Sequence, residues 1–164
     1  MTRDTSVVSP GTYLMNSGTL SSAPPIPVFS RDLDPIFLGG TIAHWTQAGH
    51  HVSYLLLTKG ERGVSAEYPD SEALKEVRFQ EQANAARTLG VTEIAYMDNP
   101  DGYLEVNLKN RELLVAEIRK RQPDIVVSCD PQTLVHHYYL NHPDHRATGQ
   151  LTVDAVFPAA GNFA

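Results

Sequence analysis

From Ile36 onward, short apolar segments alternate with longer segments of mixed polarity, and this alternation restricts the possible folds more than any other feature. The short segments predict β-strands, because strands covered on both faces are apolar along their whole length. The longer segments predict helices, and two of them are followed by Gly49 and Gly90, a residue type that favours the left-handed backbone beyond a helix end. The expected strands are Val52–Leu57, Glu93–Met97 and Ile125–Val127, and the expected helices are Thr41–Ala48, Ser71–Leu89, Leu108–Arg121 and a segment that begins near His142.

Strands that alternate with helices form right-handed βαβ units with parallel strands. The sequence therefore predicts an α/β fold with three layers, α/β/α, around a mostly parallel sheet. In such sheets ligands bind beyond the carboxyl ends of the strands. We expect any functional site to be built from the loops that follow Phe29, Leu57, Met97 and Val127.

Residues 1–27 differ in composition from the rest of the chain. They are rich in Ser, Thr, Pro and Gly and show no sustained periodicity. Such a segment buries too little apolar area to offset the entropy that ordering costs, so we expect a flexible arm over residues 1–27 and a folded domain over residues 28–164. A short strand over Pro27–Ser30 is the exception, and its prolines favour a sheet edge or a strand start.

Composition excludes several classes of function. The formal net charge of −6 disfavours binding to nucleic acid, whose partners carry clustered Lys and Arg. The one basic cluster, Arg119–Arg121, ends a predicted helix and complements its dipole. No apolar run reaches the roughly 20 residues that cross a bilayer, and no signal peptide is recognisable. A single cysteine, Cys129, excludes an internal disulfide, so we expect a cytoplasmic protein whose oligomeric state the sequence leaves open.

The most specific local pattern is Asn141-His-Pro-Asp-His145. Pro143 marks the first turn of a helix, so His142 and His145 lie on one face of that turn. Asp144, between them, can orient a ring nitrogen or the helix start. Two imidazoles and a carboxylate after a strand suit a zinc site or a general acid beside one. The alternative is a surface helix start that holds two histidines without a function.

Two weaker patterns lie elsewhere in the chain. Asp32 and Asp34 follow the first expected strand and could bind a cation or act as a base, although Asp-x-Asp is also common in solvated loops. Arg78 and Glu81 follow a partly apolar stripe of the longest helix, where a charged pair is more often structural than functional. Asp101 lies in a turn after a strand, and that position makes a function plausible.

Together these patterns resemble the PIG-L/LmbE family of metal-dependent de-N-acetylases. The resemblance covers about residues 36–157, roughly three quarters of the chain, and the His-Pro-Asp-His box is its most specific part. The matching stretches are Gly39–Ala43, Ala48–His50, Thr58–Glu61 with Gly63, Arg78 with Glu81, Leu89–Val91, Asp101–Leu104, Arg121–Ile125 and His142–His145.

The resemblance implies a Rossmann-like fold and hydrolysis of an N-acetyl group on a small amino-sugar conjugate. It implies a Zn²⁺ ion with His145 as a ligand, His142 as general acid and oxyanion stabiliser, and Asp32 as base. We group Asp144 with these catalytic residues. By the same resemblance, Asp101 lies near the substrate, and we expect Asp101 and Arg78 to bind it.

The chain departs from the family at the loop that supplies the other zinc ligands. Counted back from Gly39, the ligand His corresponds to Ser30 and the ligand Asp to Leu33. One of three protein ligands then remains, which is too few for a catalytic zinc site. We therefore expect this chain to bind zinc weakly.

The leading hypothesis is a zinc-dependent hydrolase that removes an N-acetyl group from an amino-sugar conjugate. The alternative is a non-catalytic Rossmann-like module that binds a sugar or a partner. A nucleotide-binding protein is disfavoured because no Gly-x-Gly-x-x-Gly follows the first strand. Since the resemblance ends near residues 36 and 158, we expect a domain incomplete at both ends, with a frame change or mis-assigned start before Ile36 as the hypothesis that explains it.

Overall fold

The computed structural model describes residues 38–63, 70–135 and 140–161, together with the backbones of three earlier strands. These strands are β1 (Thr5–Val8), β2 (Thr12–Asn16) and β3 (Pro25–Phe29). The later elements are α2 (Gly39–Gln47), β4 (His51–Thr58), α3 (Ser71–Thr88), β5 (Glu93–Asn99), α4 (Leu108–Arg121), β6 (Ile125–Ser128), α5 (Pro143–Asp154) and the π-helical segment η1 (Ala155–Ala160). The predicted strands and helices after residue 36 are all present.

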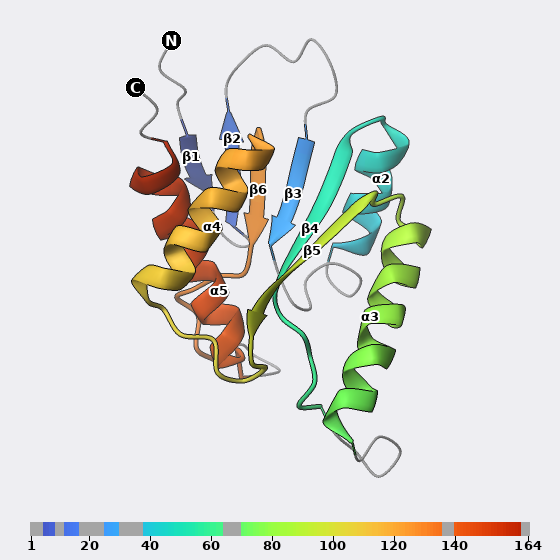
Figure 1. Cartoon of the computed structure of the whole chain (residues 1–164). Coiled ribbons are helices and arrows are strands. Elements are labelled where there is room, and N and C mark those ends of the chain that lie inside the picture. Colours follow the sequence, from blue (N-terminus) through green and yellow to red (C-terminus); the bar gives the residue numbers. More distant parts are fainter. Residues whose placement is uncertain are drawn as a thin grey trace.

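The described strands form one sheet in the order β1-β2-β6-β3-β4-β5. β3 pairs in parallel with β4 on one side and with β6 on the other, and β4 pairs in parallel with β5. β2 joins β6 antiparallel, and β1 joins β2 antiparallel. The mostly parallel sheet is therefore confirmed. The carboxyl ends of β3 to β6 all point to one edge, the lower edge in Figure 1.

Helices cover both faces of this sheet, which confirms the three layers. Along β4, Leu55 and Leu57 pack into the core under α4 and α5, whereas Val52 and Tyr54 pack into the core under α2 and α3. This alternation explains why β4 is apolar throughout. In Figure 1, α4 and α5 lie on the left and α2 and α3 on the right of the parallel strands. None of the helices in the described parts of the chain combines the length and the apolar character needed to span a lipid bilayer.

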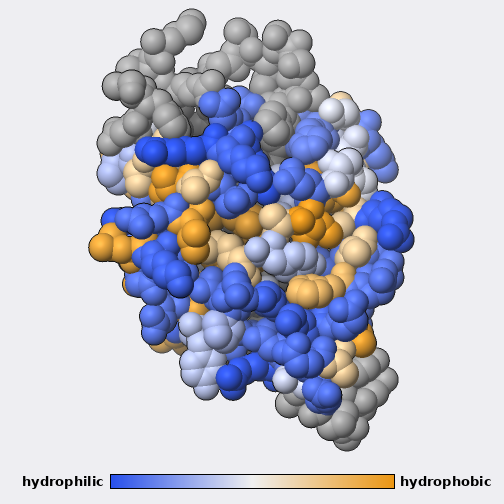
Figure 2. All heavy atoms as spheres, viewed as in Figure 1, coloured by the Kyte–Doolittle hydropathy of each residue, from blue (hydrophilic) through white to orange (hydrophobic). Residues whose placement is uncertain are grey.

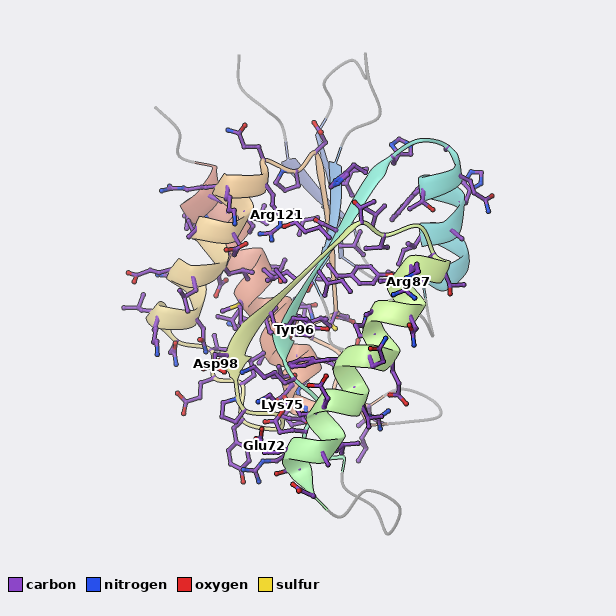
Figure 3. All side chains as sticks on the ribbon, turned by 45° about the vertical axis from the view of Figure 1, so that its right-hand side comes forward. Glu72, Lys75, Arg87, Tyr96, Asp98 and Arg121 are labelled. Atoms are coloured by element: carbon purple, nitrogen blue, oxygen red, sulfur yellow. The ribbon has the colours of Figure 1, made fainter. Side chains whose placement is uncertain are left out.

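The basic end of α4 has a structural role. Arg121, 8% exposed at its side chain, pairs with Glu93 at the start of β5 at 2.7 Å and also with Glu117 one turn earlier. In Figure 3 its side chain lies between α4 and the start of β5. On the other face of the sheet, the Tyr96 ring of β5 packs on Phe79 of α3 at 4.6 Å between centroids. These contacts fix β5 between the two helical layers.

The segment expected to be a flexible arm contributes two strands to the sheet. Residues 12–15 pair with residues 125–128, and residues 5–8 pair with β2. The expectation of no regular structure was wrong for these residues. The segment contains two short runs of strand-forming residues, such as Thr12-Tyr-Leu-Met15, and its high content of Ser and Pro outweighed them in the prediction. The domain boundary at residue 28 stays a prediction.

β3 also differs from the edge strand that its prolines suggested, because it lies between β6 and β4. Its pairing with β6 involves Val28 and Phe29, after both Pro25 and Pro27. The prolines therefore precede the part of β3 that has neighbours on both sides. Of the two positions that the prolines allowed, the structure has the strand start, with Pro25 as the first residue of β3, and not the sheet edge.

Candidate active site

Three segments meet at the carboxyl edge of the parallel strands. They are the loop after β4, the turn after β5 and the start of α5 (Figure 1). The first two are joined by reciprocal hydrogen bonds: the amide of Arg62 donates to Asp101 Oδ2 at 3.1 Å, and the amide of Asp101 donates to Glu61 Oε1 at 2.8 Å. Asp101 is 2% exposed. Its carboxylate therefore holds the loop after β4 against the turn after β5.

Asp144 joins the start of α5 to the same turn. Its Oδ2 accepts the amide of Gly102 at 2.7 Å, and its Oδ1 accepts the amide of Leu104 at 3.2 Å. The residue is 1% exposed, so these bonds form away from solvent. Each oxygen is turned toward a backbone amide of the turn. This geometry favours a positioning role over the catalytic role that we expected for Asp144.

His142 caps α5, and its ring lies beside that of His145. The Nδ1 atom accepts the amide of Asp144 at 3.3 Å, and the two ring centroids are 5.4 Å apart with planes inclined by 55°. A neutral ring that accepts at Nδ1 carries its hydrogen on Nε2. His142 can therefore donate to a substrate oxygen through Nε2–H. Both imidazoles are half-buried, as expected for side chains at the rim of a site.

Asn141 and Gly149 position this box, and sequence reasoning missed both roles. The Asn141 amide group donates to the carbonyls of Asp130 at 3.2 Å and Thr133 at 2.8 Å, which fixes the loop after β6. At Gly149 a Cβ atom would lie 2.3 Å from the carbonyl oxygen of Cys129, so α5 touches that loop through bare backbone. A glycine inside a predicted helix was the available signal for this approach.

Arg78 lies at the same edge of the sheet. Its Nη1 donates to Glu81 Oε2 at 2.6 Å, but their side chains are 47% and 55% exposed, so the expected packed face is wrong for this pair. A Cβ atom on Gly63 would lie 3.8 Å from Arg78 Nη2, which places the guanidinium beside the loop after β4. The guanidinium is therefore near the turn of Asp101, and its substrate-binding role stays a prediction.

A further ion pair joins the loop after β4 to the end of β5. Lys59 Nζ pairs with Asp98 Oδ1. The hydrogen bond and charge of Lys59 lower the pKa of the exposed Asp98 carboxyl below its ordinary value. Figure 3 shows Asp98 at the end of β5, on the side of Lys75 and Glu72 in the first turns of α3. The carboxyl edge of the sheet therefore carries an ion pair between Lys59 and Asp98.

The residues available for zinc do not fit a catalytic site. Within residues 38–63, 70–135 and 140–161, no three His, Cys, Asp or Glu side chains gather closely enough to hold a metal ion. Asp32, Ser30 and Leu33 lie outside the described residues. Neither serine nor leucine supplies a usual zinc donor, and the role of His145 as a ligand stays a prediction.

Comparison with known proteins places this site in a family. The PIG-L family, described as GlcNAc-PI de-N-acetylase, matches residues 32–156. A diacetylchitobiose deacetylase from Thermococcus kodakarensis is 39% identical over 129 residues, covering 78% of this chain and 47% of the relative. A 1D-myo-inositol 2-acetamido-2-deoxy-alpha-D-glucopyranoside deacetylase from Kineococcus radiotolerans is 31% identical over 157 residues, covering 80% of this chain and 44% of the relative.

A solved structure shares the fold. The N,N'-diacetylchitobiose deacetylase from Pyrococcus horikoshii, complexed with an inhibitor, superposes with a TM-score of 0.76 at 31% identity, covering 86% of this chain and 54% of the other. The chain spans about half the length of the curated relatives that it matches. Sequence, fold and the ordered motifs agree, and the chain belongs to the PIG-L family of de-N-acetylases.

Proposed function

We propose that this chain functions in the hydrolysis of an N-acetyl group from a small amino-sugar conjugate. The observation that carries the proposal is the bridge from Asp144 to Gly102 and Leu104, because it holds the His-Pro-Asp-His box against the turn of Asp101. Curated relatives of the chain are deacetylases of N-acetylglucosamine derivatives. A site with imidazoles on one side and a buried carboxylate on the other suits binding and cleavage of such an amide.

Each residue has a proposed part in this reaction. Asp101 binds the sugar by accepting hydrogen bonds, and Arg78 binds it by donating them. Asp32 accepts a proton from the attacking water and passes it to the amide nitrogen as the C–N bond breaks, so that acetate and the free amino sugar leave. His142 donates through Nε2–H to the oxygen that becomes negative in the tetrahedral intermediate. Asp144 holds the turn and the helix start at the spacing that these roles require.

Zinc is expected from the family, and His145 is the residue that we assign to it. Ser30 and Leu33 stand where further ligands are expected, so we propose that zinc binding is weak in this chain. The pair of substitutions Ser30→His and Leu33→Asp should raise the affinity for zinc by orders of magnitude, because it supplies three protein ligands. Adding His145→Ala to that pair is the matched control and should reverse the gain.

The test measures acetate release and zinc content together. The purified chain and the Ser30→His, Leu33→Asp variant are incubated with diacetylchitobiose and with N-acetylglucosamine linked to inositol, with zinc added. We expect acetate release by the variant, reduced when His142→Gln is added. A zinc-loaded variant that releases no acetate would contradict the proposal and favour a non-catalytic binding module.

A further inference from the structure

Tyr103 is a large aromatic side chain that the fold leaves exposed at the edge of the candidate site. It is 63% exposed, although its neighbours Asp101 and Leu104 are 2% and 8% exposed. Single exposed apolar residues are common on protein surfaces and need no function. What distinguishes Tyr103 is that buried groups hold the backbone beneath it.

The backbone on both sides of Tyr103 is anchored. The amides of Gly102 and Leu104 donate to the two oxygens of Asp144, and the amide of Tyr103 donates to the carbonyl of Pro100 at 3.2 Å. A loop held at successive amides loses little further entropy when a ligand binds to it. The backbone that carries the Tyr103 ring is therefore held in place.

One face of the ring is covered by a cation. The guanidinium carbon of Arg62 lies 4.4 Å from the ring centroid, within the range of a cation–π contact. The amide of Arg62 is itself bound by Asp101, so the partner of the ring is also held in place. Tyr103 is nevertheless 63% exposed, so the contact with Arg62 leaves most of the residue open to a ligand.

We propose that the open face of Tyr103 is a stacking platform for a pyranose ring of the substrate. The inference rests on the proposed function, since the class of ligand follows from it. Pyranose rings carry axial C–H bonds on one face, and an aromatic ring is an apolar surface of matching size. Binding sites of small molecules combine such surfaces with a few converging polar groups. Here Tyr103 would supply the apolar contact and the half-exposed guanidinium of Arg78 a polar one, which favours conjugates with a second ring beside the N-acetylated sugar.

The chain offers a matched control for an exposed aromatic residue. Phe157 is 69% exposed in η1, which lies after the carboxyl end of α5 and away from the edge where α5 begins (Figure 1). On the face shown in Figure 2, hydrophobic residues gather in a band across the middle, and the lower edge is mainly hydrophilic. Leu134, Val135 and Leu140, between β6 and α5, are exposed apolar side chains as well, but none of them is aromatic.

The experiment titrates the full-length chain and its variants with diacetylchitobiose and with N-acetylglucosamine, and follows binding by ligand-observed NMR. Tyr103→Ala should weaken binding of diacetylchitobiose by about threefold to tenfold, the range that aromatic contacts support. Tyr103→Phe should bind as the unmodified chain does, since the ring is kept, and Phe157→Ala should also leave the affinity unchanged.

The outcomes separate this inference from the proposed function. Unchanged affinity in Tyr103→Ala would overturn the platform alone. An equal loss in Tyr103→Phe and Tyr103→Ala would also overturn it, because the phenol hydroxyl rather than the ring would then make the contact. If the unmodified chain binds neither sugar, both the platform and the proposed function are overturned. Loss in Tyr103→Ala with retention in Tyr103→Phe supports both.

Discussion

Replacing Gly149 by alanine tests whether α5 is held against the loop after β6 by direct backbone contact. The new Cβ atom would lie 2.3 Å from Cys129 O and 2.9 Å from Pro131 N. Close carbon–oxygen contacts in proteins are about 3.3–3.6 Å, so the overlap is on the order of 1 Å. Neither neighbour is a side-chain end that can rotate away. The helix or the loop must therefore move.

The expected magnitude is the difference between two effects. Overpacking of this kind costs about 1–3 kcal/mol, whereas alanine in place of glycine inside a helix gains about 0.5–1 kcal/mol. The difference runs up to about 2.5 kcal/mol, and because both clashing neighbours are backbone atoms we expect Gly149→Ala to lower the free energy of unfolding by an amount in the upper half of that range, a measurable part of a typical stability of about 5–15 kcal/mol. Because α5 begins beside His142, the same shift should also weaken sugar binding.

Urea unfolding followed by circular dichroism gives the free energy of unfolding, and Gly40→Ala is the matched control. Gly40 lies in α2, and a Cβ atom there would meet nothing within 4 Å. That variant should be stabilised by up to about 1 kcal/mol, since the gain in helix propensity is unopposed. If Gly149→Ala is stabilised as much as Gly40→Ala, the close contact does not exist and the reasoning is refuted.

Three further predictions concern the carboxylates and amides of the site. Asp144→Asn should lower the free energy of unfolding by about 1–3 kcal/mol, because the side-chain NH2 of Asn cannot accept the backbone amide that a carboxylate oxygen of Asp144 accepts. Hydrogen exchange at the Gly102 amide should accelerate in this variant. Asn141→Ala should also lower stability by about 1–3 kcal/mol in urea unfolding, since two backbone carbonyls lose their donor. Asp98 has a folded pKa below its ordinary value of 3.8, so its ion pair stabilises the fold above that pH and is lost as the pH falls through the folded pKa. An NMR titration should show that Lys59→Met raises the pKa of Asp98 toward 3.8.

Asn141→Ala has a control variant, and each of the other two predictions has an outcome that would contradict it. Gln80→Ala removes an exposed hydrogen bond to Asn84 and should change stability little, in contrast to Asn141→Ala. Unaltered exchange at Gly102 in Asp144→Asn would show that the turn does not depend on the carboxylate. A pKa of Asp98 that stays low in Lys59→Met would show that another group lowers it.

The helices and parallel strands after residue 36 could be predicted because their signals are local. Leu108–Arg121 was predicted with its observed bounds, and Asn107 before it caps the helix by accepting the amide of Asn110 at 2.9 Å. Gly49 and Gly90 have positive φ angles of 90° and 76°, as a helix end requires. Period, caps and glycines lie within a few residues of the elements that they specify.

The site could be predicted in its residues but not in their partners. The hydrogen bond from the Gly102 amide to Asp144 joins positions 42 apart in the chain, and no local sequence pattern predicts it. Arg78 is exposed because none of the described neighbouring elements covers its side chain, and the spacing of apolar residues in α3 does not reveal whether such a cover exists. Long-range pairing also places β2 in the sheet, because its partner β6 comes far later in the sequence, and β1 joins the sheet only through β2.

The position of β6 has a consequence for the order in which the sheet can form. β3, β4 and β5 follow one another along the chain and pair through single helical crossovers, so their contacts span less of the sequence than the pairing of β2 with β6. β2 has no place in the sheet until β6, far later in the sequence, has paired with β3. The β1–β2 hairpin is therefore expected to dock last during folding and to open first during unfolding, with β2 amides exchanging faster than those of β4.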